Sequence, residues 1–406
     1  MVFEANFRQV VYALSDALDL VGVDDVAHGK RVGVMAAECA KALGYAVPEV
    51  QFLFDLGLLH DIGVSSTAVH QHLVNEFDWA GSQGHAAAGY ELLRNFRPLA
   101  DMALPIRYHH TRWDALQSLD VDEGVRRRAN LILLVDRVDA MAAPFYASGK
   151  VLQHREAIRR EIQARSGSYF APLLVEAFLK VSQHEAFWLY LEPEALHGYM
   201  EDMLAAARPM SASHAEMLQL ARIFSSIVDA KSAFTAAHSL GVAQVARSLA
   251  CRMGLGEARC DEVEMAGLLH DLGKLRVPDE ILDKPAPLSD DERMVMNTHS
   301  FVTMQILRKI RGFESIAAWA ADHHEAPGGT GYPNGLDGAA LPLEARILRV
   351  ADIFQAMVQD RPYRKGLSAE DVAAFMQEQA RRGSVDREVT EVLLAHLQDM
   401  IVAAQP

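Results

Sequence analysis

The sequence predicts an all-α protein built from two tandem helical bundles. Long runs rich in Ala, Leu, Met and Glu dominate the chain, and segments with the sustained apolar-polar alternation of strands are scarce. The chain has 406 residues, of which 50% are hydrophobic, and this is enough for more than one buried core. We therefore expect two folded domains of ordinary size.

An internal repeat with a period of about 210 residues predicts the two bundles. The segment DLGLLHDIG, which ends at Gly63, matches MAGLLHDLG, which ends at Gly273. Upstream, HGKRVGVMAAECAKALG begins at His28 and matches HSLGVAQVARSLACRMG, which begins at His238. The repeat predicts that both halves of the chain fold alike.

The paired segments 28–44 and 238–254 each predict a helix with one buried face. After the first histidine, apolar residues recur at positions 32, 35, 39 and 43, and the second segment repeats this spacing. Each segment closes on a glycine, which suits the C-terminal cap of a helix. A histidine thus stands at the start of each buried helix face.

We place the domain bounds at residues 1–205 and 213–406. The intervening sequence AAARPMSAS interrupts the helical pattern with small residues, serine and proline. A helix that continues through this segment and joins the bundles rigidly is the alternative. Residues 166–204 are expected to add the helices that complete the first bundle.

Charge and composition exclude several classes of partner. The net charge of -15 and the lack of a Lys/Arg-rich, aromatic-interleaved face argue against binding to DNA or RNA. The sequence shows neither a signal peptide nor about 18 uninterrupted apolar residues, so we expect a cytoplasmic protein that does not enter membranes. Cys39, Cys251 and Cys260 lack CxxC spacing and are expected to be buried free thiols.

Seven potential metal ligands recur in the same order in both halves. A single histidine on an apolar helix face is more simply a core residue, but a repeated set of histidines and aspartates favours a metal site. Imidazole and carboxylate suit iron, manganese, nickel or zinc. An aspartate that bridges two such ions could hold a water between them as hydroxide, ready to attack phosphorus. The candidates are His28, His60, Asp61, His85, His109, His110 and Asp136 in the first half, and His238, His270, Asp271, His299, His323, His324 and Asp352 in the second.

Further motifs surround the second ligand set. His270-Asp-Leu-Gly-Lys274 has the form HDxGK, and His323-His324-Glu325 leads to Gly331-Tyr332-Pro333. Arg361-Pro362-Tyr363 follows downstream. Together these residues resemble the HD superfamily of metal-dependent phosphohydrolases, and the second half resembles its HD-GYP subfamily.

The resemblance implies a phosphodiesterase that opens a bacterial cyclic dinucleotide, either cyclic di-GMP or cyclic GMP-AMP, to the linear form and in some members onward to mononucleotides. It implies two divalent ions, iron or manganese before nickel or zinc, bridged by Asp271. Lys274 would share the catalytic role beside the phosphate, and Tyr332 would lie against a base or ribose. Arg361 and Arg364 would hold the other phosphate, a contact that suits the guanidinium group.

The chain departs from the family pattern at several positions. The loop Ala326–Thr330 lacks the aspartate that usually precedes a glycine there, which bears on the choice of substrate. Members with three metals carry a glutamate where this chain has Phe234, so we expect two metals. In the first half Val64 takes the lysine position, and nothing after His110 resembles GYP. We therefore expect a divergent HD domain that regulates the second, supports it, or forms a homodimer.

Two other functions compete with the phosphodiesterase. A catalytically silent receptor or adaptor would bind the dinucleotide and recruit partners, and the altered loop is its only support in the sequence. A phosphohydrolase of another small phosphate ester, acting through the first half, is the third reading.

Overall fold

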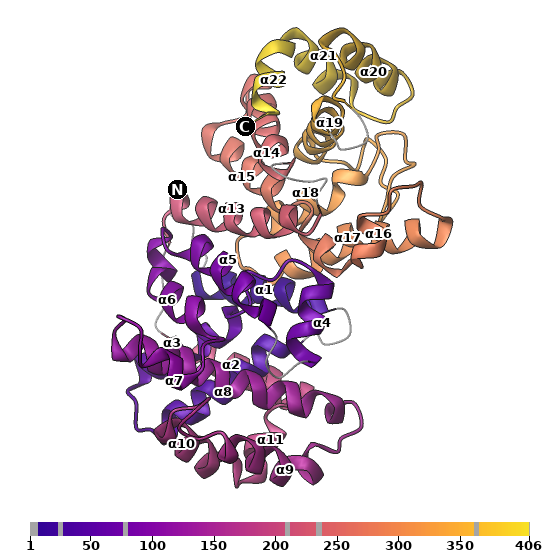
Figure 1. Cartoon of the computed structure of the whole chain (residues 1–406). Helices are drawn as coiled ribbons and strands as arrows, with labels where there is room; N and C mark the ends of the chain where they lie inside the picture. Colours follow the sequence, from indigo (N-terminus) through magenta and orange to yellow (C-terminus); the bar gives the residue numbers. More distant parts are fainter. Residues whose placement is uncertain are drawn as a thin grey trace. The chain divides into compact units, whose positions relative to one another are not determined.

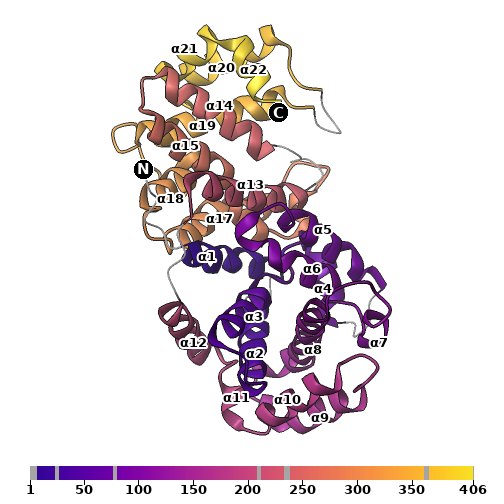
Figure 2. The same ribbon diagram turned by 90° about the vertical axis from the view of Figure 1, so that its left-hand side faces the viewer.

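The computed structural model describes residues 7–22, 27–75, 80–207, 212–232, 238–360 and 365–405. Within these ranges the chain is helical and contains no strand, only the isolated bridges of Ser166 with Phe170 and of Gly328 with Asp337 (Figures 1 and 2). The all-α prediction is confirmed. No helix among the described residues is long and apolar enough to cross a membrane.

The chain divides into two compact units. One unit is Leu18–Pro209, and the other combines Met210–Pro406 with Met1–Ala17. Helix α1 (Phe7–Asp19) therefore groups, up to Ala17, with the C-terminal half of the chain. The bounds predicted from the sequence, residues 1–205 and 213–406, remain a prediction.

The N-terminal unit is organised around an antiparallel helix pair that packs against a long third helix. Helices α2 and α3 form the pair, and α8 packs on α2. The helices are α2 (His28–Ala42), α3 (Val47–Leu59), α4 (Thr67–Asn75), α5 (Gln83–Leu93), α6 (Ala100–Tyr108), α7 (Trp113–Leu116), α8 (Glu123–Tyr146), α9 (Val151–Ala164), α10 (Pro172–Ser182), α11 (Glu185–Leu189) and α12 (Pro193–Ala206), with short 3-10 turns η1 (Leu20–Gly22), η2 (Ala80–Ser82) and η3 (Arg97–Leu99).

The C-terminal unit repeats this core, with α14, α15 and α19 in the places of α2, α3 and α8. Its elements are α13 (His214–Ala230), α14 (His238–Arg252), α15 (Glu257–Leu269), η4 (Leu272–Arg276), α16 (Asp279–Leu282), α17 (Asp290–Leu307), α18 (Glu314–Ala321), η5 (Asp322–His324), α19 (Leu343–Val358), α20 (Ala369–Arg381), α21 (Arg387–Ala395) and α22 (Leu397–Ala403).

The helix pairs lie where the repeat predicted them. Val32, Met35 and Cys39 on the expected face of α2 are fully buried. Gly44 follows the end of α2 as expected, and its φ of 74° lies in the left-handed region that glycine adopts most readily. The pair approaches so closely that a Cβ on Gly57 of α3 would lie 2.5 Å from the Cα of Gly33. The two glycines therefore allow the helix backbones to pack at this short distance.

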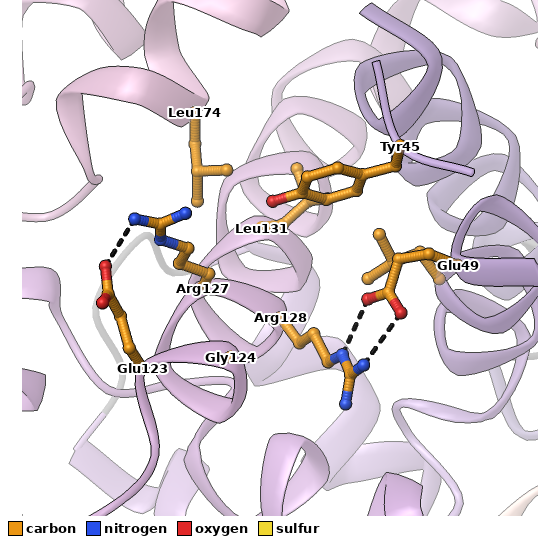
Figure 3. A pocket seen from close by; sticks show the side chains of 9 residues that line it. Tyr45, Glu49, Glu123, Gly124, Arg127, Arg128, Leu131 and Leu174 are labelled. Atoms are coloured by element: carbon orange, nitrogen blue, oxygen red, sulfur yellow. Dashed lines mark hydrogen bonds and ion pairs between the residues drawn. The ribbon is translucent and has the colours of Figure 1, made fainter. Parts of the chain in front are cut away.

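An ion pair joins matching helices in both units, but the helices that carry the arginine and the glutamate are exchanged between the units. In the N-terminal unit Arg128 of α8 donates two hydrogen bonds of 2.7 and 2.8 Å to Glu49 of α3 (Figure 3). In the C-terminal unit the arginine is on the other helix, and Arg259 of α15 donates to Glu344 of α19 at 2.6 Å. The hollow in Figure 3 is lined by neither set of candidate ligands.

The three cysteines are free thiols, as predicted. Cys39 and Cys260 are buried, whereas Cys251 is only partly buried, because it lies near the exposed end of α14.

Candidate metal centres

The structure brings the seven candidate ligands of the C-terminal half together from separate elements. His238 opens α14, His270 and Asp271 follow the end of α15, and His299 lies within α17. The remaining three come from η5 and α19. Their donor atoms form two groups, each with its atoms within 4.8 Å of one another: His238, His270 and Asp352, and His299, His323 and His324.

Asp271 lies between these two groups. Its Oδ2 is 3.2 Å from Nε2 of His270 and 3.8 Å from Nε2 of His238. Its Oδ1 is 3.5 Å from Nε2 of His299 and 3.9 Å from Nε2 of His323. One carboxylate therefore presents one oxygen to each donor group, which is the arrangement that bridging two cations requires.

Backbone carbonyls orient the histidines of the centre. In three of them Nδ1 lies 2.7 Å from the carbonyl oxygen three residues earlier, and these are His270, His299 and His323. Because a carbonyl oxygen only accepts, each Nδ1 carries a proton, and Nε2 is the nitrogen that faces Asp271 and could bind a cation. Burial lowers the pKa of His299 to about 4 and that of His324 to about 3, so both imidazoles are neutral near pH 7.

The donor set fits divalent cations. Nε2 of His270 and Oδ1 of Asp271 are buried without a hydrogen-bond partner among the described residues. A buried polar atom left in this state costs about 1–3 kcal/mol, which a bound cation would remove. Burial raises the pKa of Asp271, but the charges of His270 and Lys274 outweigh it and hold the pKa well below its usual range. The carboxylate is therefore ionised and available as a ligand.

Two of the predicted substrate-binding residues lie at this centre. Nζ of Lys274, in η4, is 2.5 Å from Oδ2 of Asp271. The ring of Tyr332 stacks on His324, with centroids 4.7 Å apart and an angle of 29° between the planes. Arg361, Arg364 and Phe234 lie outside the described residues.

Sequence reasoning missed three residues that shape the site. Glu325 accepts hydrogen bonds of 2.6, 3.1 and 2.9 Å from the backbone N–H groups of residues 334, 335 and 336, which fixes the loop around Tyr332. The Thr303 hydroxyl accepts from the Gly273 N–H and donates to the His270 carbonyl. Gln355 accepts from Nδ1 of His238 at 2.5 Å. Glu325 stands in the quoted motif with His323 and His324, but nothing in the sequence marks the contacts that these three residues make.

The N-terminal unit carries a second centre with the same division of donors. Oδ2 of Asp61 is 3.5 Å from Nε2 of His60 and 3.8 Å from that of His28. Its Oδ1 is 3.2 Å from Nε2 of His85 and 3.7 Å from that of His109. The other two predicted ligands are placed as in the C-terminal centre: His110 belongs to the group around His85, and Oδ1 of Asp136 is 3.4 Å from His28.

The surroundings of the N-terminal centre differ from those of the C-terminal centre. Val64, at the position matching Lys274, is 2% exposed and brings no charge. Arg137 donates to Asp136 at 2.8 Å, so that one oxygen of this carboxylate is already paired. A cavity of about 20 Å³ lies beside His28, His60 and Val64. This is room for a single water molecule.

Comparison with known proteins identifies the family. Residues 26–143 and residues 199–389 each match an HD domain. The chain therefore belongs to the HD-domain family, which confirms the resemblance drawn from the sequence. Members of this family are metal-dependent, and both units carry the corresponding His/Asp clusters.

Within that family the chain is a homologue of cyclic-dinucleotide phosphodiesterases. It is 37% identical over 400 residues to the 3'3'-cGAMP-specific phosphodiesterase 1 of Vibrio cholerae. The aligned region covers 98% of this chain and 93% of the relative. It is 39% identical over 150 residues to the cyclic di-GMP phosphodiesterase response regulator RpfG of Xanthomonas campestris, covering 36% and 40% of the two chains. The crystal structure of the cyclic GMP-AMP specific phosphodiesterase V-cGAP3 of V. cholerae superimposes with a TM-score of 0.65 at 25% identity, covering 96% of this chain and 97% of that one.

Proposed function

We propose that the C-terminal unit hydrolyses a phosphodiester bond of a cyclic dinucleotide at the centre around Asp271. The observation that carries this proposal is the division of the Asp271 oxygens between two donor groups. Two divalent ions held there, iron or manganese, would polarise a phosphoryl oxygen and activate water. The ligands we assign are His238, His270, Asp271, His299, His323, His324 and Asp352.

The residues around these ligands would bind and orient the substrate. Lys274 places an ammonium group at the rim of the centre, where it would stabilise negative charge that develops on the phosphoryl oxygens. The Tyr332 ring, held against His324, offers its other face or its hydroxyl to a base or ribose. Arg361 and Arg364 would contact the second phosphate, and the product would be the linear dinucleotide.

We infer that 3'3'-cGAMP is the preferred substrate. A relative that matches this chain across both units is named as specific for that dinucleotide, with 98% of this chain covered. The match to RpfG, a cyclic di-GMP phosphodiesterase, covers only 36% of it. The loop Ala326–Thr330, next to the site and different from the family pattern, is where we expect the preference to arise.

For the N-terminal unit we infer metal binding without cleavage of the dinucleotide. Its ligands His28, His60, Asp61, His85, His109, His110 and Asp136 repeat the C-terminal arrangement. Val64 supplies no charge for a phosphate at the position that Lys274 takes in the C-terminal unit. A regulatory or supporting role follows.

Turnover by metal-loaded protein tests the proposal. The protein is purified without oxygen, its metals are counted, and 3'3'-cGAMP and cyclic di-GMP are offered side by side. We expect cleavage of 3'3'-cGAMP, abolished in His270→Ala and retained in His60→Ala. Metal binding without cleavage of either dinucleotide would favour a silent receptor. Cleavage lost in His60→Ala and kept in His270→Ala would place the activity in the N-terminal unit.

A further inference from the structure

The first histidine of the C-terminal centre is connected to the last turn of the chain. Nδ1 of His238 lies 2.5 Å from Oε1 of Gln355, and Nε2 of Gln355 lies 3.2 Å from the carbonyl oxygen of Ala404. Gln355 and Ala404 are each 1% exposed. A buried chain of two hydrogen bonds therefore joins His238 to the residue that follows α22.

The order of donors and acceptors along this chain is fixed. The Ala404 carbonyl can only accept, so the amide nitrogen of Gln355 must face it. The amide oxygen then faces His238, and an oxygen without a hydrogen can only accept as well. Nδ1 of His238 must therefore carry the proton, which leaves its Nε2 lone pair directed at Asp352, 3.3 Å away, and at Asp271. This is the tautomer that a metal ligand needs.

The N-terminal centre fixes the same tautomer with charged groups. There Nδ1 of His28 lies 2.8 Å from Asp139, which occupies the position matching Gln355. Asp139 also accepts from Arg31 at 2.7 and 3.0 Å and from the hydroxyl of Tyr146 at 2.8 Å. In this unit a carboxylate held in a buried ion pair accepts the hydrogen bond from Nδ1 of the first histidine, whereas in the C-terminal unit a neutral amide accepts it.

The position that matches Arg31 explains how the C-terminal turn reaches Gln355. It is occupied by Gly241, and a Cβ there would lie 2.6 Å from the Ala404 oxygen and 2.9 Å from Cγ of Gln355. Without a side chain at 241 the end of the chain fills the space that the arginine takes in the N-terminal unit. The carbonyl of Ala404 replaces the guanidinium as the partner of the residue beside the histidine.

We propose that Gln355 is a positioning residue for the metal ligand His238, and that the C-terminal turn at Ala404 holds it in place through the space left by Gly241. The proposal rests on metal binding at the C-terminal centre, as proposed above. The partner of a ligating histidine sets the orientation and basicity of the ring, and its loss typically weakens metal binding about 10- to 100-fold. The turn at Ala404 is therefore part of what would determine metal affinity.

Mn²⁺ titrations of the full chain test this, in a His60→Ala, Asp61→Ala background that leaves the C-terminal centre to bind metal. Gln355→Leu keeps the volume and removes both hydrogen bonds, so we expect Mn²⁺ affinity to fall about 10- to 100-fold. Gln355→Glu keeps an acceptor for His238 and loses only the hydrogen bond to Ala404, so its Mn²⁺ affinity should fall less than that of Gln355→Leu. Gln377→Leu, at an exposed glutamine of α20, is the matched control and should change nothing.

Gly241→Ala tests the hold at Ala404 and should weaken Mn²⁺ binding by displacing the turn. With saturating Mn²⁺, Gln355→Leu should regain its kcat with an unchanged KM, which a general packing defect would not allow. Parental Mn²⁺ affinity in Gln355→Leu, or equal losses in the Leu and Glu variants, would overturn the positioning role, and unchanged affinity in Gly241→Ala would overturn the role of the C-terminal turn. Because affinity is measured without substrate, these results stand even if the chain cleaves no cyclic dinucleotide.

Discussion

Replacing Lys274 by methionine removes a charge from the rim of the C-terminal centre and keeps most of the side-chain volume. Nζ of Lys274 is 2.5 Å from Asp271, and its side chain is 19% exposed, so the ammonium is partly shielded from water. Two unit charges about 4 Å apart interact by about 4 kcal/mol at an effective dielectric constant of about 20, which is typical of a partly shielded site near a protein surface. If about half a charge develops on the phosphoryl oxygens, the loss is about 2 kcal/mol, or about 30-fold in kcat.

Steady-state turnover and metal content measured on the same samples check this prediction. We expect kcat to fall by about 30-fold while the two metals are retained, because lysine is not a ligand. Lys284→Met is the matched control, since Lys284 pairs with Glu292 in the same unit and belongs to neither donor group. A fall of less than about threefold, or a loss of turnover that simply follows a loss of metal, would refute the electrostatic role.

The remaining predictions concern the substrate loop, the reversed ion pair and the response to pH. Glu325→Ala releases three backbone N–H groups of the loop, so KM for 3'3'-cGAMP should rise about tenfold in initial-rate assays with metal content unchanged, and an unchanged KM would contradict the role of this loop. Arg128→Glu should lower the free energy of unfolding by about 1 kcal/mol, since both partners are partly exposed, and adding Glu49→Arg should restore it in urea denaturation, whereas additive losses would exclude the pairing. The pKa of His299 is lowered to about 4, so the unfolded chain binds more protons between there and the ordinary value of 6.5, and the metal-free protein should melt at progressively lower temperatures as pH falls through this window. A His299→Asn variant should show a weaker pH dependence in the same melting curves.

The fold and the clustering of the candidate ligands were predictable because the two halves of the chain repeat the same residues in the same order. A histidine such as His85 means little alone, but its recurrence as His299 in the same order of motifs favours a candidate ligand over a core residue. The helical spacing around His28 and His238 then determined which faces are buried. These are local patterns, which a sequence displays directly.

The residues that orient the ligands could not be predicted in the same way. Glu325 acts on backbone groups about ten positions away, and Thr303 acts on a turn 30 residues earlier. Gln355 depends on the approach of Ala404, which follows from the folding of α20, α21 and α22 rather than from any local pattern. The expected roles of Arg361 and Arg364 stay predictions, since both lie outside the described residues.

The exchanged signs of the ion pair have a consequence for how a duplicated chain assembles. Two similar bundles on one polypeptide invite misassembly, in which a helix docks into the wrong copy. If α3 docked against α19, Glu49 would meet Glu344, and if α15 docked against α8, Arg259 would meet Arg128. Each exchange brings like charges together where the correct pairing joins opposite ones. The two ion pairs therefore favour the docking of each helix within its own unit over docking in the other unit.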